Sequence, residues 1–154
     1  MKQHELSTLD DAKLVWMFVE PMISKARGKD PDIKAQVFKS LNDGQRALFM
    51  FQVLYGHAAN GIFPFFSYVS FLTDRLDIWS ALKSAMNYFD DTEMLSLVEK
   101  METAYFAVSS QDKNTPAMNE LDKLYIEMLP RTLNRIGACI RNNPTEFNDT
   151  DMSS

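Results

Sequence analysis

Apolar residues recur at three- and four-residue spacing along most of this chain, which is the period of an amphipathic helix. The longest stretches with this pattern cover 14–23, 76–89, 94–108 and 121–140. We find no strand-length alternation of apolar and polar residues and no internal repeat. The pattern therefore predicts an all-α fold of six or seven helices.

Capping residues, glycines and prolines divide this pattern into separate helices. Ser7 or Thr8 is expected to cap the first helix, and Pro21 to kink or split it, because proline removes a backbone donor. Asn60-Gly61 is expected to end the central helix with a left-handed residue. Pro130 predicts a kink in the last helix. Further starts are predicted at Asp30-Pro31, Asn42 or Asp43, Thr73 or Asp74, and Asp90-Asp91.

One segment, residues 47–73, carries no charged side chain over 27 consecutive positions. It exceeds the roughly 20 residues that a helix needs to span a bilayer. However, Asn60-Gly61 interrupts it, and Gln52 and His57 are polar. The segment therefore predicts a buried hairpin of two apolar helices at the centre of the fold and not a membrane span.

Length and cysteine content describe a compact protein of the reducing cytoplasm. The chain has 154 residues, which suits one domain, here expected over 1–147 with a disordered tail at 148–154. The single cysteine, Cys139, cannot form an intramolecular disulfide, and the N-terminus lacks the apolar segment of a secretory signal. We expect Cys139 to fill the core and the protein to be cytoplasmic.

Motifs for catalysis are missing from the sequence. It has no glycine-rich phosphate loop, no GxSxG and only two histidines, so we assign no catalytic residue, metal ligand or cofactor and expect no enzyme. An enzyme or small-molecule site would have to use His57, with Tyr55 and Asn60 lining a pocket. The alternative is a buried imidazole that hydrogen-bonds to a neighbouring backbone or hydroxyl group.

An aromatic cluster follows the central helix, with five aromatic residues between 63 and 71. Such a cluster can be core. However, five aromatic rings in nine positions occupy more than one face of a helix, so some must point away from it. The cluster therefore also predicts a contact in a homodimer, made by Phe63, Phe65, Phe66 and Tyr68.

Negative charge is concentrated in one part of the chain. The net charge is −5, and the window 90–127 contains nine acidic residues against three lysines. This balance disfavours direct nucleic-acid binding, which needs clustered Lys and Arg, and favours a basic partner protein. The alternatives are a solvated helix face and, near residue 90, a helix cap with first-turn anions. The candidate partner-binding residues are Asp90, Asp91, Glu93, Glu99, Glu102, Glu120 and Asp122.

Two segments carry a family resemblance. They are LNDGQRALFMFQVLYGHAANGIFPFF at 41–66 and LDKLYIEMLPRTLNRIGACIRNNPTEF at 121–147, with an acidic helix between them. The chain resembles the DNA-mimic protein nineteen family, a bacterial domain, in three motifs. These are LxxGQRAL at 41–48, Asn60-Gly61 with Phe63 and Phe66, and NP-x-x-F at 143–147. The chain departs from the family at Ile62, where a second glycine is usual, and at Pro64-Phe65, where a polar pair is usual.

The resemblance implies an all-helical, dimeric domain whose acidic side chains a DNA-binding protein accepts in place of DNA. Together with the acidic window, it predicts a non-enzymatic interaction protein that presents an acidic helical face to a basic protein. The alternatives are an immunity or antitoxin protein that shields a basic toxin, or a small-molecule-binding protein or enzyme with a pocket at His57.

Overall fold

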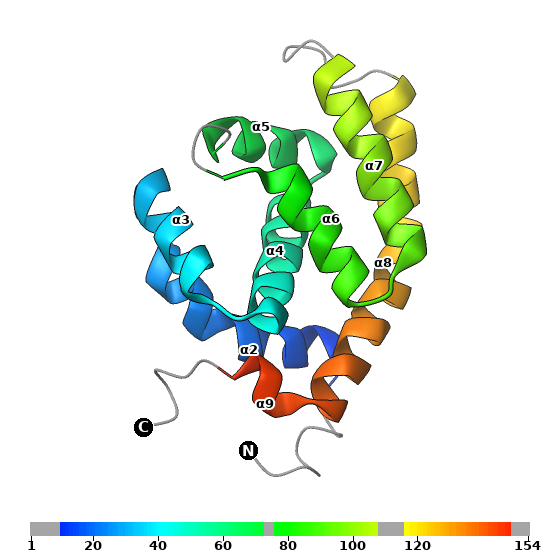
Figure 1. The fold of residues 1–154 in the computed structure, drawn as a ribbon. Coiled ribbons are helices and arrows are strands. Elements are labelled where there is room, and N and C mark those ends of the chain that lie inside the picture. The colour runs from blue at the N-terminus through cyan, green and yellow to red at the C-terminus, as the bar shows by residue number, and fades with distance from the viewer. Residues whose placement is uncertain (1–9, 73–75, 108–115, 149–154) are drawn as a thin grey trace.

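The computed structural model describes residues 10–72, 76–107 and 116–148, and every regular element in these ranges is a helix (Figure 1). The prediction of an all-α fold is confirmed. Seven helices correspond to predicted segments, and the short α9, which begins at Pro144, is additional. In chain order they are α2 (Asp11–Ala26), α3 (Pro31–Ser40), α4 (Asp43–His57), α5 (Ile62–Leu72), α6 (Ile78–Tyr88), α7 (Thr92–Ala107), α8 (Pro116–Asn142) and α9 (Pro144–Phe147).

Several helix starts are those predicted. Asp30 caps α3 by accepting a hydrogen bond from the Ile33 backbone N–H at 2.9 Å. Asn42 and Gln45 form a reciprocal capping box at the start of α4, at 2.8 and 2.9 Å. Each cap satisfies backbone donors that the first turn of a helix otherwise leaves unpaired. Helix α4 ends earlier than predicted, at His57 with Ala58 as its C-cap, and Gly61, with a φ of 115°, lies directly before α5.

Other boundaries differ from the predictions. Within the described residues the first helix is capped by Asp10, because Ser7 and Thr8 lie outside them. Helix α6 is capped by Asp77, whereas Thr73 and Asp74 lie outside the described residues. Neither internal proline splits its helix, since α2 continues through 21 and α8 through 130.

Helix α4 runs through the middle of the fold and packs against α2, α3, α5, α6 and α9 (Figure 1). Leu48, Met50, Phe51 and Leu54 are fully buried, so its apolar side chains meet neighbours on nearly every side, as the uncharged run predicts. Helices α2 and α7 pack against α8, and the buried residues form one continuous core. None of the helices in the described ranges is long and apolar enough to cross a membrane.

The start of α4 also fastens the C-terminal end of the described chain. The Asn42 amide donates to the Glu146 carbonyl at 3.1 Å, and the Gln45 amide donates to the Asn148 carbonyl at 2.5 Å. Between these anchors the Phe147 side chain is fully buried. The first turn of α4 therefore fixes α9 against the core.

Candidate functional site

Two of the seven predicted partner-binding acids are used inside the fold. The Asp91 carboxylate is buried, accepting from the Met94 backbone N–H at 3.0 Å and from the Thr132 hydroxyl at 2.7 Å. Asp122, on α8, accepts from the Ile62 backbone N–H at 2.8 Å and so caps α5 from a distant part of the chain. Both carboxylates stabilise helix starts, so neither extends an outward-facing row.

The other five predicted acids lie on the surface but are not equivalent. Glu93 forms an exposed ion pair with Arg131 of α8 at 3.0 Å. Asp90 is exposed in the turn before α7, with a left-handed φ of 56°. Glu120 is exposed near the start of α8. Glu99 and Glu102 are the remaining two, and they lie on α7 next to α6.

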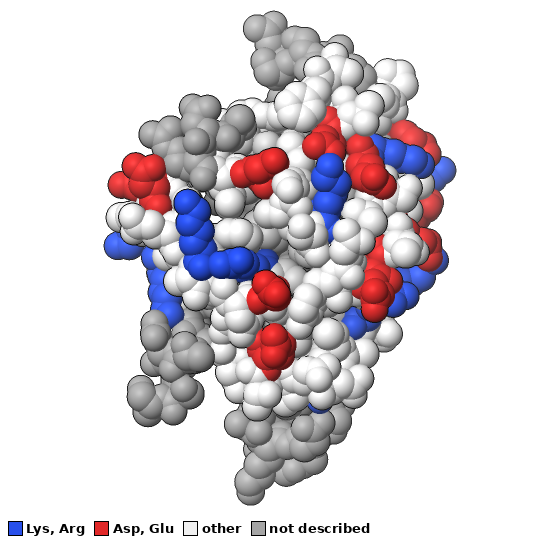
Figure 2. All heavy atoms as spheres, in the orientation of Figure 1, with Lys and Arg blue, Asp and Glu red and all other residues white. Residues whose placement is uncertain are grey.

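The seam between α6 and α7 contains two of these acids, Glu99 and Glu102. Glu102 accepts a hydrogen bond from the Lys83 ammonium at 2.8 Å. This bond, with added Coulombic attraction from Glu102, Glu99 and Asp77, raises the pKa of Lys83. Two carboxylates of α7, Glu99 and Glu102, therefore act on Lys83 at this seam, and Figure 2 shows acidic and basic side chains intermixed over α6 and α7. We name Glu99, Glu102 and Lys83 the α6–α7 acidic patch; Asp77 caps α6 and is not part of it.

The predicted pocket residues around His57 do not converge. His57 lines a cavity of about 290 Å³, but neither Tyr55 nor Asn60 belongs to its lining. The Tyr55 ring instead stacks on Phe51, with ring centroids 5.5 Å apart. The cavity takes its lining from the end of α2, from α3, from the C-terminal half of α4 and from Tyr68 of α5. We name it the basic cavity, because its charged residues are Arg27 and Lys34.

The surroundings of His57 match neither expectation from the sequence. It shares no pocket with Tyr55 and Asn60, and it is not a buried imidazole. Its ring is exposed on one side and stacks on Tyr68 on the other, with ring centroids 3.7 Å apart and an interplanar angle of 17°. Partial burial, and secondarily the charge of Lys34, lower the pKa of His57 below its ordinary value. The imidazole is therefore neutral at pH 7 and has no carboxylate partner within the described residues.

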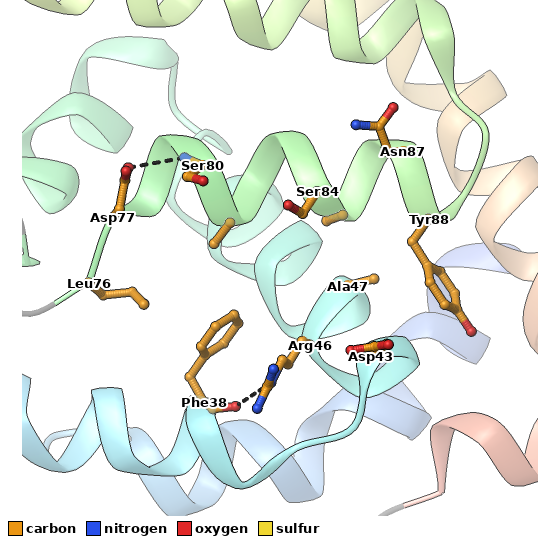
Figure 3. A pocket seen from close by; sticks show the side chains of 12 residues that line it. Phe38, Asp43, Arg46, Ala47, Leu76, Asp77, Ser80, Ser84, Asn87 and Tyr88 are labelled. Atoms are coloured by element: carbon orange, nitrogen blue, oxygen red, sulfur yellow. Dashed lines mark hydrogen bonds between the residues drawn. The ribbon is translucent and has the colours of Figure 1, made fainter.

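A second, larger hollow of about 660 Å³ lies between α3, α4 and α6 (Figure 3). Arg46 projects into it, but its guanidinium already donates to the carbonyls of Phe38 and Lys39 at 3.2 and 2.6 Å. Asp43 and Asp77 also line the hollow. Its charges are mixed and its cation is engaged, so it does not select a ligand by charge. No sequence pattern indicates this hollow, because its walls come from three helices.

The predicted dimer contact is wrong for two of its four aromatic residues. Phe65 is fully buried and Phe66 nearly so, and both rings make edge contacts with Trp79, at 5.7 and 6.0 Å. They belong to the core because α6 and α7 cover the face of α5 that carries them. Phe63 and Tyr68 are half-buried and remain at the surface.

Metal-ligating side chains and the single cysteine were the remaining candidates for chemistry. Among the described residues, no group of three or more His, Cys, Asp or Glu could hold a metal ion. Cys139 is half-buried, and burial, with the charges of Asp90 and Glu146, raises its pKa. Its thiolate is therefore disfavoured at neutral pH.

Comparison of the chain with protein-family models, with characterised proteins and with solved structures finds no match. The resemblance to the DNA-mimic protein nineteen family therefore stays a prediction. A function for this chain has to be argued from the geometry of the α6–α7 acidic patch and of the basic cavity.

Proposed function

We propose that this protein is a non-enzymatic interaction protein and that its α6–α7 acidic patch binds a basic protein. The observation that carries the proposal is the placement of Glu102, 2.8 Å from Lys83, and of the exposed Glu99 one turn earlier on α7. Such a surface attracts a positively charged partner and accelerates its association, by an effect that salt weakens.

An exposed aromatic side chain adjoins this patch. Phe106 follows Glu102 by four residues, so the two lie on the same side of α7. Its side chain is 73% exposed, the largest exposed fraction among the exposed large apolar residues described. Aromatic residues are enriched at protein interfaces, and a handful of them supply most of the binding energy. Charge would steer the partner to the patch, and Phe106 would add apolar contact.

A DNA-binding protein is the more specific partner that we propose, with the patch standing in for phosphates. Duplex DNA carries about one charge per 1.7 Å of its axis. Glu99 and Glu102 are three residues apart, which corresponds to about 4.5 Å along a helix axis. The patch is therefore less densely charged than DNA, and binding to a basic protein does not require it to reproduce the phosphate spacing.

The test compares capture of partners by the wild-type protein and by Glu99→Gln/Glu102→Gln, from an extract of the source cells at low and high salt. We expect the wild type to retain a basic protein at low salt and the double variant to lose it. The matched control is Glu120→Gln/Glu127→Gln, which removes the same charge from exposed positions on α8. Equal loss in both double variants would show that overall charge, and not this patch, is responsible.

Experiments with the purified partner then distinguish a DNA mimic from an immunity protein. If the protein is a DNA mimic, duplex DNA should compete with it for the partner. If it is an immunity protein, the partner should be a toxin whose activity falls on binding. Capture that is unchanged in Glu99→Gln/Glu102→Gln would overturn the proposal in either form.

A further inference from the structure

The basic cavity is unusual for a chain of net charge −5, because no carboxylate occurs among the described residues that line it. Its titratable lining residues are Arg27, which follows α2, Lys34 of α3, His57 of α4 and Tyr68 of α5. The larger hollow between α3, α4 and α6 contains carboxylates beside its arginine. The basic cavity thus differs from that hollow in carrying charge of one sign.

Its two cations are positioned without being neutralised. The Lys34 ammonium lies over the ring of Tyr68, a lining residue, at 5.4 Å, and the Arg27 guanidinium lies over the ring of Trp16, which is not a lining residue, at 5.7 Å. Cation–π contacts of this kind orient a cation while leaving its full charge. Within the described residues neither side chain forms an ion pair, so the cavity carries a charge of about +2 at neutral pH, where His57 is neutral.

The remaining walls are mostly apolar, with Gln52 as their one polar side chain. Ile23, Phe49 and Val53 contribute to the lining, together with the face of the Tyr68 ring. A volume of about 290 Å³ is at the lower end of the range for small-molecule sites, roughly 300–1,000 Å³. The cavity therefore offers two cationic groups, a neutral imidazole and an apolar surface to one small ligand.

We infer that the basic cavity binds a small organic dianion, a phosphate monoester with an apolar substituent. The two charges of the phosphate match Arg27 and Lys34, and guanidinium and ammonium groups are the usual partners of phosphate oxygens. The substituent would lie against Phe49 and Val53. This inference is independent of the acidic patch, which lies on α6 and α7.

His57 supplies a local reporter for the test. A dianion bound beside the imidazole favours its charged form, so binding raises the pKa of His57 from its lowered value. The groups that face His57 across the cavity are Lys34, Arg27 and Tyr68, and the first two can be replaced one at a time by glutamine. Nuclear magnetic resonance of the histidine ring protons separates His57 from His4, the other histidine.

The experiment titrates the full chain with phenyl phosphate, inorganic phosphate and phenol. We expect saturable shifts of the His57 signals with phenyl phosphate, which should bind more tightly than either fragment. Lys34→Gln and Arg27→Gln should each weaken binding by about tenfold or more. Lys100→Gln, an exposed lysine on α7, should leave the affinity unchanged.

A steric variant tests the cavity without altering its charge. Gly56 lines it, and a Cβ there would approach the Gln52 amide nitrogen at 3.2 Å, the mobile end of a side chain. Gly56→Leu should therefore fold, as checked by circular dichroism, and should bind phenyl phosphate at least about tenfold more weakly. Any one of three results would overturn the inference. These are no saturable shift in the wild type, binding of inorganic phosphate as tight as that of phenyl phosphate, and binding by all three cavity variants equal to that of the wild type.

Discussion

Asp91 joins two helices through one buried carboxylate, and its removal should strongly destabilise the fold. One oxygen accepts from the Met94 backbone N–H and so caps α7, and the other accepts from the Thr132 hydroxyl of α8. Both partners are buried: Met94 is 0% exposed and Thr132 is 1% exposed. The Met94 N–H and the Thr132 hydroxyl would therefore both lose the partner that this carboxylate provides.

The size of the effect follows from these two bonds. Loss of an N-cap side chain costs about 1 kcal/mol. A buried hydroxyl left without a partner costs about 1–3 kcal/mol. Asp91→Ala should therefore lower the free energy of unfolding by about 2–4 kcal/mol, out of the roughly 5–15 kcal/mol typical of a domain.

Urea unfolding followed by circular dichroism measures this change. Asp90→Asn is the matched control: it also removes a carboxylate, but from an exposed residue, and asparagine tolerates the left-handed φ of 56°. The control should change stability by less than about 0.5 kcal/mol. Thr132→Val with Asp91→Ala should cost less than the sum of the single changes, because each removes the other's partner. Equal effects of Asp91→Ala and Asp90→Asn would refute this account of the carboxylate.

Two further perturbations test other parts of the fold. Gly137→Ala should lower the free energy of unfolding by about 1–3 kcal/mol in the same urea assay. A Cβ at this position would come within 2.9 Å of the Asp11 Cγ and would displace the Asp11 carboxylate from its 2.7 Å ion pair with Arg141. A stabilised variant would contradict this packing. The pKa of His57 is lowered in the folded state, so the imidazole binds a proton more readily in the unfolded chain. His57 should therefore reduce the stability of the fold as the pH falls through 6.5, the ordinary pKa of histidine. His57→Gln should lose this part of the pH dependence, measured as the difference in thermal midpoint from the wild type at each pH.

The helices were predictable because local signals determine them. Asp30 with Pro31, and Asn42 with Gln45, act within one turn of chain, so their caps follow from the sequence alone. The uncharged run likewise predicted the burial of α4. By contrast, the aromatic residues of α5 could not be assigned to core or surface, because α6 and α7 decide which of its faces is covered.

The candidate site was less predictable, because its formation depends on contacts between distant segments. Acidic residues look alike in a sequence, yet Asp122 caps a helix 60 residues away whereas Glu99 remains exposed. Lys83, the cation of the patch, lies outside the predicted acidic window and meets Glu102 only because α6 packs against α7. The basic cavity was indicated by His57 alone, since Arg27 and Lys34 meet it only after α2 and α3 fold against α4.

The positions that carry the family resemblance have structural roles in this fold. Asn42 of the 41–48 motif bonds to the backbone of Glu146 in the 143–147 motif, and Gln45 bonds to the backbone of Asn148, just after it. Phe147 fills the core between these two bonds. A Cβ at Gly44 would lie 2.8 Å from both the Tyr88 hydroxyl and the Glu146 side chain, so glycine is needed where α9 docks. These residues could be kept to preserve the packing of α9 against α4 while the surface charges changed freely. The motifs are therefore explained by this packing of α9 against α4, and binding must be argued from the α6–α7 acidic patch and the basic cavity, which lie elsewhere.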